Sequence, residues 1–180
     1  MRDDSKTDLL HVALVQFDIA WKDPQSNLNR IDKLIEGIAA DLIVLPEMFG
    51  TGFIDDPDQT DLHDQQCLEW MKQLAVKKEA AVTGSLAVEV DGKYYNRMYF
   101  VTPDEKEIHY DKKHLFALGD EAKVFEPGGA PVLASFKGWT FSLSICYDLR
   151  FPAWARYHAP YDVFLCVANW PAPRVNAWDS

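Results

Sequence analysis

The sequence is poor in cysteine, in long apolar runs and in signals for export, and each shortage excludes a class of protein. Its three cysteines are an odd number, stand far apart and form no Cys-x-x-Cys pair, so neither a disulfide framework nor a zinc site is expected. The longest uncharged apolar run, near residues 163–170, is far shorter than the roughly 20 residues of a membrane-spanning helix. The polar, acidic N-terminus MRDDSKTDLL is not typical of a secretory signal. We therefore expect a soluble, cytoplasmic protein with no membrane partner.

Basic residues are also few. The 18 Lys and Arg are outnumbered by 28 Asp and Glu, which gives a net charge of −10, and no basic cluster exceeds a pair. Because phosphate binding needs a basic footprint, a nucleic-acid partner is disfavoured. A small anionic substrate stays compatible with this charge if a local cation holds it. The composition, 48% apolar and 26% charged, is that of a globular protein, and we predict one domain over residues 1–180.

The first fifty residues alternate between strand-like and helix-like patterns, which predicts an α/β fold. A strand is expected over residues 9–17. Asp23-Pro24 is a helix-start signal, and apolar residues recur at helical spacing from there to Ile38. The continuous apolar run 41–47 indicates a strand that is buried on both faces.

The rest of the chain predicts mainly strands. Asp91-Gly92 is the strongest hairpin signal in the sequence. The other expected elements are helices over 67–81 and over RFPAWARYH, strands over 107–116, 139–148 and 161–169, and irregular loops over 48–61 and 116–131.

Three reactive side chains stand at or just beyond the end of an expected strand: Glu47, Lys112 and Cys146. Catalytic groups of α/β sheets gather outside the carboxyl ends of strands. A thiol needs activation, because the thiolate is the nucleophile, and a carboxylate can take its proton. A nearby ammonium lowers the thiol pKa and can bind a developing oxyanion. The three residues are therefore chemically sufficient for acyl transfer without histidine.

Each of these residues also has a structural interpretation. A buried cysteine in a strand is more often a small core residue, and a Pro-Glu after a strand is more often an exposed loop carboxylate. A cysteine–histidine enzyme, with His114 or His158 as base, is a rival hypothesis. A metal site from His109 and His114 is disfavoured, because their offset of five residues places them on opposite faces of one strand.

Three blocks of the sequence, VLPEMF, YDKKHLF and ICYDLRFP, resemble in order the motif blocks of the nitrilase superfamily of carbon–nitrogen hydrolases. The resemblance runs from VALVQFD (12–18) to NWPAPR (169–174), and PEMFGTGF and NWPAPR are most similar to the omega-amidase branch. It implies an α-β-β-α four-layer sandwich whose protomers pair as homodimers or larger homo-oligomers. It also implies hydrolysis of the terminal amide of a small 2-oxo acid amide, such as 2-oxoglutaramate or 2-oxosuccinamate, with no metal or organic cofactor.

The resemblance assigns roles residue by residue. Cys146 is the nucleophile that forms a thioester, Glu47 is the general base, and Lys112 matches the lysine of the family's Lys-x-His-Leu pattern. Glu121 matches a second glutamate that supports the lysine and the leaving group. The backbone N–H of Tyr147 is a second donor to the oxyanion.

Substrate contacts are expected near the same blocks. Phe49, Phe116 and Trp170 are candidates for the walls of a small pocket, with ordinary core packing as the alternative interpretation. A substrate carboxylate favours an arginine, and Arg174 in NWPAPR is the candidate. Asp148 and Arg150 are expected to brace the turn after Cys146.

Two alternatives to this function remain. One is another activity of the same superfamily, on aliphatic amides, N-carbamoyl amines or nitriles. The other is an inactive fragment, because family members usually continue well beyond the point where this sequence stops.

Overall fold

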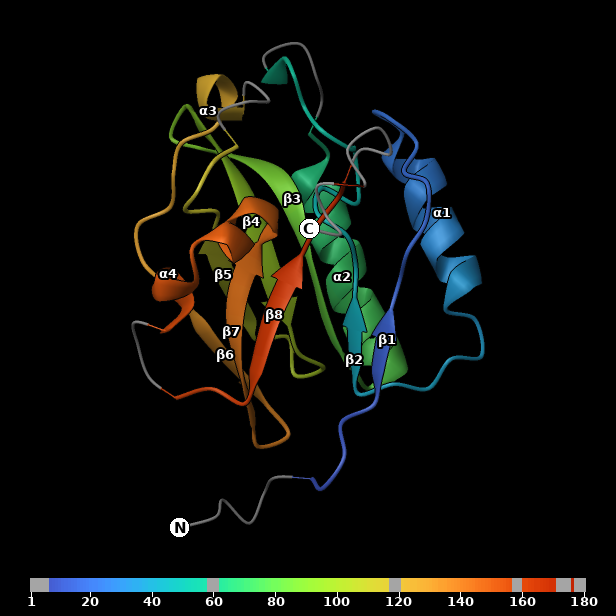
Figure 1. Cartoon of the computed structure of the whole chain (residues 1–180). Coiled ribbons are helices and arrows are strands. Elements are labelled where there is room, and N and C mark those ends of the chain that lie inside the picture. Colours follow the sequence, from blue (N-terminus) through green and yellow to red (C-terminus); the bar gives the residue numbers. More distant parts are fainter. Residues whose placement is uncertain (1–6, 58–61, 117–120, 157–159, 171–175, 177–180) are drawn as a thin grey trace.

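The computed structural model describes residues 7–57, 62–116, 121–156, 160–170 and 176. Two β-sheets stack face to face, and two helices cover the outer face of one of them (Figure 1). Within the described residues this gives three layers of the predicted four-layer sandwich, and the α/β class is as predicted. In chain order the elements are β1 (Val12–Leu14), α1 (Pro24–Leu34), β2 (Leu42–Val44), α2 (Asp64–Lys78), β3 (Ala81–Val90), β4 (Lys93–Val101), β5 (Glu107–Asp111), α3 (Glu121–Val124), β6 (Leu133–Phe136), β7 (Trp139–Ile145), η3 (Cys146–Arg150), α4 (Pro152–Arg156) and β8 (Val163–Val167).

Helix α1 begins where the sequence predicts. The side chain of Asp23 accepts a hydrogen bond from the backbone N–H of Ser26 at 3.0 Å, and Pro24 occupies the first helical position. The helix ends at Leu34, four residues before the predicted end at Ile38. Gly37 has a φ of +72°, a left-handed conformation that continues no helix, and this explains the earlier end.

The larger sheet has the order β1-β2-β3-β4-β5. Strands β1, β2 and β3 are parallel, and β4 and β5 are added antiparallel. Both residues of the predicted turn, Asp91 and Gly92, have positive φ, as a two-residue hairpin requires. Helices α1 and α2 pack on the outer face of this sheet through a cluster that includes Ile31, Met71 and Val82.

The smaller sheet has the order β6-β7-β8, with β6 and β7 antiparallel and β7 and β8 parallel. Its inward side chains, such as Phe141 and Leu165, pack against Phe100 and Tyr110 of the larger sheet. Two short elements in the second half of the chain, α3 and β6, were not predicted. Each has only four residues, which is too short for a period to emerge from the pattern.

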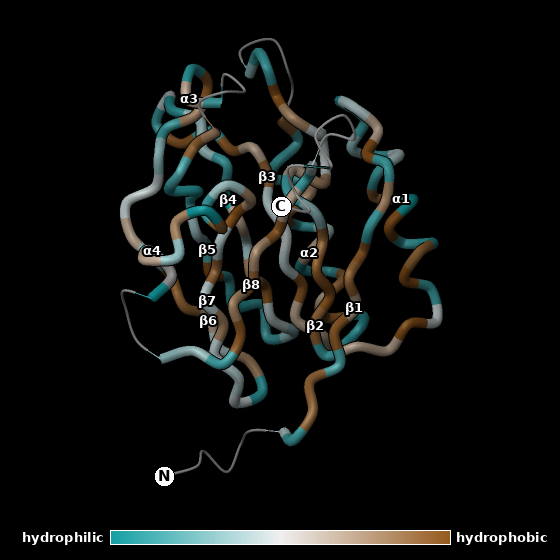
Figure 2. Tube along the Cα trace, in the orientation of Figure 1, coloured by the Kyte–Doolittle hydropathy of each residue, from teal (hydrophilic) through white to brown (hydrophobic). Residues whose placement is uncertain are grey.

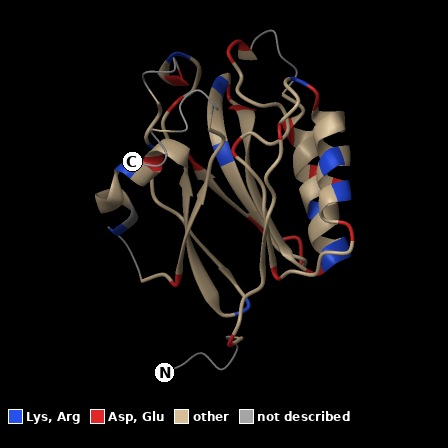
Figure 3. Ribbon diagram, turned by 45° about the vertical axis from the view of Figure 1, so that its right-hand side comes forward, with Lys and Arg blue, Asp and Glu red and all other residues tan. Residues whose placement is uncertain are grey.

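Apolar residues follow the strands (Figure 2), and many of the charged residues lie on the helices and the loops (Figure 3). The space between the sheets is therefore an apolar core with few charges. Among the described residues, no helix combines the length and the hydropathy that crossing a membrane requires.

Candidate active site

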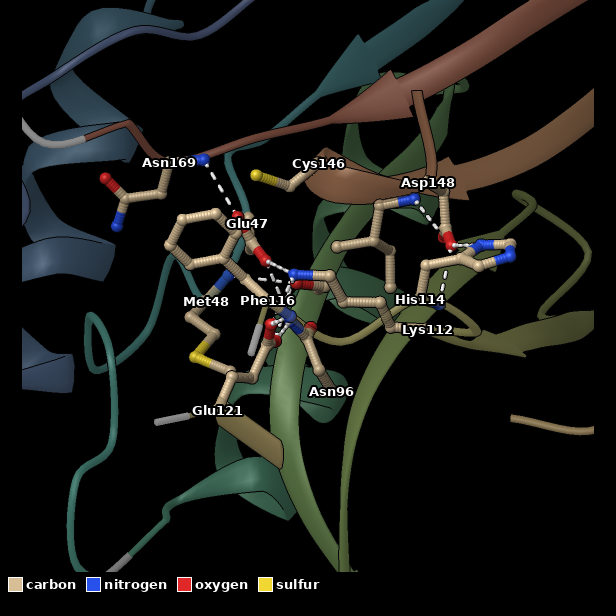
Figure 4. Close-up of polar contacts among 12 residues, drawn as sticks. Glu47, Met48, Asn96, Lys112, His114, Phe116, Glu121, Cys146, Asp148 and Asn169 are labelled. Carbon is tan, nitrogen blue, oxygen red and sulfur yellow. Dashed lines mark hydrogen bonds and ion pairs between the residues drawn. The ribbon is translucent and has the colours of Figure 1, made fainter. Parts of the chain in front are cut away.

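Glu47, Lys112 and Cys146 lie together at one end of the sandwich, each just beyond the end of a different strand (Figure 4). Glu47 follows β2, Lys112 is the first residue after β5, and Cys146 is the first residue after β7. Since β2 and β5 belong to one sheet and β7 to the other, the two sheets bring residues from distant parts of the sequence to one place. All three side chains are buried, and the exposed fraction of the Cys146 residue is 8%.

Two carboxylates and one ammonium form the polar centre of the cluster. The Nζ atom of Lys112 lies 2.9 Å from Oε1 of Glu47 and 2.9 Å from each carboxylate oxygen of Glu121. Its three N–H groups therefore match three acceptors. The second oxygen of Glu47 accepts a hydrogen bond of 3.1 Å from the backbone N–H of Asn169, and Oε2 of Glu121 accepts one of 2.7 Å from the backbone N–H of Phe116.

Burial raises the pKa of the Cys146 thiol, and the neighbouring charge of Glu47 raises it further, against a smaller opposite effect of Lys112. The Lys112 pKa behaves differently: burial would lower it, but the charges of Glu47, Glu121 and Cys146 together raise it. The lysine is thus held protonated, and the cysteine rests as a thiol. A resting thiol needs a base within reach, and Glu47 is close enough to hydrogen-bond it.

Cys146 occupies a strained turn. Its φ of +46° is left-handed, a conformation that side chains other than Gly adopt at a cost and that often marks a functional site. The chain passes there from extended strand β7 into the short 3-10 helix η3. This change of direction ends the strand three residues earlier than its predicted end at residue 148 and places the thiol at the end of the sandwich.

Asp148 holds this turn, as the sequence predicted. Its carboxylate, buried between the elements, accepts hydrogen bonds from the backbone N–H of Ile145 at 3.0 Å and from the hydroxyl of Tyr110 at 2.8 Å. It also accepts one from the backbone N–H of His114 at 2.9 Å. The segment that carries Lys112 and the turn that carries Cys146 are therefore joined through one carboxylate.

His114 belongs to this bracing network. Its Nδ1 atom lies 2.7 Å from Oδ1 of Asp148, and its ring stacks on Phe151 with centroids 3.8 Å apart. Figure 4 shows the ring on the side of Asp148 that faces away from Cys146. This position favours Glu47 over His114 as the base. The other candidate of the rival hypothesis, His158, lies outside the described residues.

The remaining predicted site residues lie in different surroundings. Phe116 and Tyr147 lie beside the cluster, and their rings meet edge to face with centroids 5.2 Å apart. Trp170 directly follows Asn169 and packs, partly buried, against the apolar residues between the sheets. Arg150 is exposed, and Arg174 lies outside the described residues.

The prediction of Phe49 as a pocket wall is wrong. Its side chain is fully buried in the other core, between the helices and the larger sheet, where its ring lies 6.0 Å from that of Trp70. Gly84 leaves room for the ring, because a Cβ at that position would lie 3.0 Å from it. The alternative interpretation, ordinary core packing, is the correct one.

Asn96 is a polar neighbour that the sequence analysis missed. Its side-chain amide donates to Oε1 of Glu47 at 2.8 Å and to Oε1 of Glu121 at 3.2 Å. A fully buried Asn inside a strand is unusual, because strands are depleted in this residue. That exception in KYYNRMYF was the available signal.

Metal coordination has little support in this arrangement. Across the part of the chain that the structure describes, no group of three or more His, Cys, Asp and Glu side chains is placed to hold a metal ion. The carboxylates of the cluster are already occupied by the lysine and by amide donors.

Comparisons with known proteins agree on one family. The family profile described as carbon-nitrogen hydrolase matches residues 11–178. The chain is 39% identical over 172 residues to omega-amidase YafV of Escherichia coli strain K12, covering 95% of this chain and 67% of that one. It is 35% identical over 178 residues to 2-oxoglutaramate amidase of Bacillus subtilis, covering 94% of this chain and 68% of that one.

Solved structures give the same result. A CN-hydrolase superfamily protein of Xanthomonas campestris, whose crystal structure has an arsenic adduct in its active site, matches with a TM-score of 0.86 at 35% identity. The match covers 94% of this chain and 68% of that one. An amidase from Nesterenkonia, with a TM-score of 0.80 at 24% identity over 92% of this chain and 68% of that one, shares the fold. The chain thus spans about two thirds of the length of these relatives.

Proposed function

The chain belongs to the carbon–nitrogen hydrolase family, and we propose that it hydrolyses the terminal amide of a small 2-oxo acid amide to the acid and ammonia. The observation that carries the proposal is the buried cluster of Glu47, Lys112 and Cys146 at the strand ends. Two relatives, named omega-amidase and 2-oxoglutaramate amidase, support the choice of substrate class.

The first half of the proposed reaction forms a thioester. Glu47 takes the proton of the Cys146 thiol, and the sulfur attacks the amide carbonyl carbon. The carbonyl oxygen becomes an oxyanion, which the charge of Lys112 and the backbone N–H of Tyr147 stabilise. When the C–N bond breaks, Glu47 returns the proton to the leaving nitrogen, and ammonia departs.

The second half releases the acid. Glu47 takes a proton from a water molecule, and the resulting hydroxide attacks the thioester carbonyl. The C–S bond then breaks, and the sulfur recovers a proton from Glu47. The raised pKa of the resting thiol makes a base necessary in the first half, and the same carboxylate is needed in the second half to activate water.

Lys112 acts in this scheme through its charge. Its three N–H groups contact carboxylate oxygens, so a direct hydrogen bond to the oxyanion requires one of those contacts to be exchanged. Glu121, with two contacts to the lysine, fixes the position of this charge.

A substrate panel tests the proposal. The panel comprises 2-oxoglutaramate, 2-oxosuccinamate, a nitrile, an N-carbamoyl amino acid and a simple aliphatic amide, with ammonia release as the measurement. We expect the two 2-oxo acid amides to give the highest kcat/KM. A preference for the nitrile or the carbamoyl compound would refute the assignment and favour another activity of the family.

Recognition of the substrate carboxylate is a separate part of the proposal. We assign it to Arg174 from its position in NWPAPR. Arg174→Ala should raise KM for 2-oxoglutaramate much more than KM for the neutral amide. Equal effects on the two substrates would remove Arg174 from this role.

A further inference from the structure

The hydrogen bonds around Asn96 show which acceptor sites of Glu47 and Glu121 are occupied. An ionised carboxylate has about four lone-pair sites, two on each oxygen. In Glu121 all four are used, since each oxygen accepts from Lys112, Oε1 also accepts from Asn96, and Oε2 also accepts from the N–H of Phe116. Glu121 therefore has no acceptor site left for the proton of the thiol.

Glu47 has one site left. Its Oε1 accepts from Lys112 at 2.9 Å and from Asn96 at 2.8 Å, which uses both lone pairs. Its Oε2 accepts only from the N–H of Asn169, at 3.1 Å, among the hydrogen bonds of the described residues. In Figure 4 the Cys146 sulfur lies on the side of the carboxylate that Asn169 contacts. The remaining site is therefore the one that faces the thiol.

We propose that Asn96 is a positioning residue that closes Oε1 of Glu47 to protons and so directs the proton of the Cys146 thiol to Oε2. The proposal rests on the proposed function, in which Glu47 accepts that proton. Without Asn96, a proton on Oε1 would neutralise the base on the side away from the thiol. The base would then be unable to act, although its carboxylate had not moved.

The orientation of the Asn96 amide supports this role. Its NH₂ group contacts two carboxylate oxygens, and the opposite orientation would place its carbonyl oxygen against them. Its own carbonyl oxygen, Oδ1, is buried and has no hydrogen-bond partner in the described structure. An unpartnered buried carbonyl lowers stability, and an apolar residue would avoid that cost. The two N–H donors of the amide, rather than packing, therefore explain why an asparagine stands at this position.

The strand order explains why this residue can reach both glutamates. Asn96 lies on the same face of β4 as Met98 and Phe100, which face the core between the sheets. Its backbone carbonyl accepts a hydrogen bond of 2.9 Å from the N–H of Lys112. The amide is thus fixed next to the lysine by main-chain pairing.

The test compares Asn96→Leu, of similar volume and without donors, with Thr83→Val. Thr83 is a matched control, because it is also fully buried and its hydroxyl donates to the carbonyl of Tyr99. For each protein the rate of Cys146 alkylation by iodoacetamide is measured against pH, with Cys146→Ala giving the background. This readout needs no substrate, so it decides the role of Asn96 even if 2-oxo acid amides are not hydrolysed. Ammonia release from 2-oxoglutaramate then gives kcat and KM separately.

In Asn96→Leu we expect the acid limb of the alkylation profile to move to higher pH, because Glu47 holds a proton more readily without the donor. We expect kcat to fall by about tenfold to a hundredfold with KM unchanged, while Thr83→Val keeps the profile of the wild type. A profile for Asn96→Leu that matches Thr83→Val would overturn the proposal, as would a change in KM alone. If Asn96→Leu does not fold, Asn96→Ser decides: one remaining donor should give a smaller shift in the same direction, and an unshifted profile overturns the proposal.

Discussion

Replacing Lys112 by Met tests how much the positive charge of this residue contributes to stability and activity. The substitution keeps most of the side-chain volume and removes the ammonium that contacts both Glu47 and Glu121. The side chains of Lys112, Glu47 and Glu121 are 1%, 0% and 9% exposed, so the two carboxylates would remain buried without a cation. Breaking a buried ion pair on one side costs about 3–5 kcal/mol of unfolding free energy. This is a large share of the roughly 5–15 kcal/mol that stabilises a typical domain.

The sign of the pH dependence follows from the same contacts. Unpaired buried carboxylates favour the protonated form, so the folded variant binds more protons than its unfolded chain. Its stability is then greatest in acid and decreases as the pH rises. Urea unfolding of Lys112→Met at about pH 5 and about pH 8 should show this decrease, whereas the wild type, with the ion pairs intact, should not.

The neighbouring lysine provides a matched control. Nζ of Lys113 donates to the carbonyl of Gly128 at 2.9 Å and lies 5.6 Å above the ring of Trp154, so it serves packing at the surface. Lys113→Met should cost about 1 kcal/mol and keep its activity. Lys112→Met should lose about 10²–10³ in kcat at equal folded fraction, the effect of removing one oxyanion stabiliser. The reasoning is refuted if Lys113→Met loses as much activity, or if Lys112→Met stays within a few-fold of the wild type.

Three further predictions test the parts around the site. Asp148→Asn replaces a carboxylate that accepts four hydrogen bonds by an amide with one acceptor oxygen. It should lower the unfolding free energy by about 3 kcal/mol, measured by calorimetry, and reduce kcat, measured by ammonia release. Gly128→Ala would place a Cβ 2.0 Å from the carbonyl oxygen of Asp111 and should destabilise the fold by about 1–3 kcal/mol, whereas Gly129→Ala, with open space around it, should change little in the same urea titration. Burial raises the pKa of Cys67 from 9.0 to about 12, so the stability from its neutral thiol should be present below pH 9 and decrease as the pH rises toward 12; equal decreases in Cys67→Ala and wild type would contradict this.

The sequence predicted the parts of the site that depend on local pattern. Glu47, Lys112 and Cys146 each follow a strand that the sequence predicts, and parallel or stacked strands bring such ends together. The turn at Cys146 and the bracing by Asp148 followed from the same local stretch. The family resemblance then placed Glu121, which α3 presents to the lysine from a segment predicted to be a loop.

Contacts that depend on which face a side chain occupies were not predictable. Phe49 stands only two residues from Glu47, yet the left-handed turn at Met48 directs it into the opposite core. Asn96 reaches the glutamates because the pairing of β4 with β5 sets it beside Lys112, and a shift of one residue in that pairing would turn it to the other face. Such long-range registers are fixed by the packed sheet and have no signature in the local sequence.

The most direct test of the central claim is the rate of ammonia release by Cys146→Ala compared with Cys166→Ala. Cys166 is a fair control, because its thiol lies 3.9 Å from the carbonyl oxygen of Cys146 and burial also raises its pKa, to about 12. The account predicts that Cys146→Ala releases no ammonia above background and that Cys166→Ala remains active. Turnover by Cys146→Ala would contradict it.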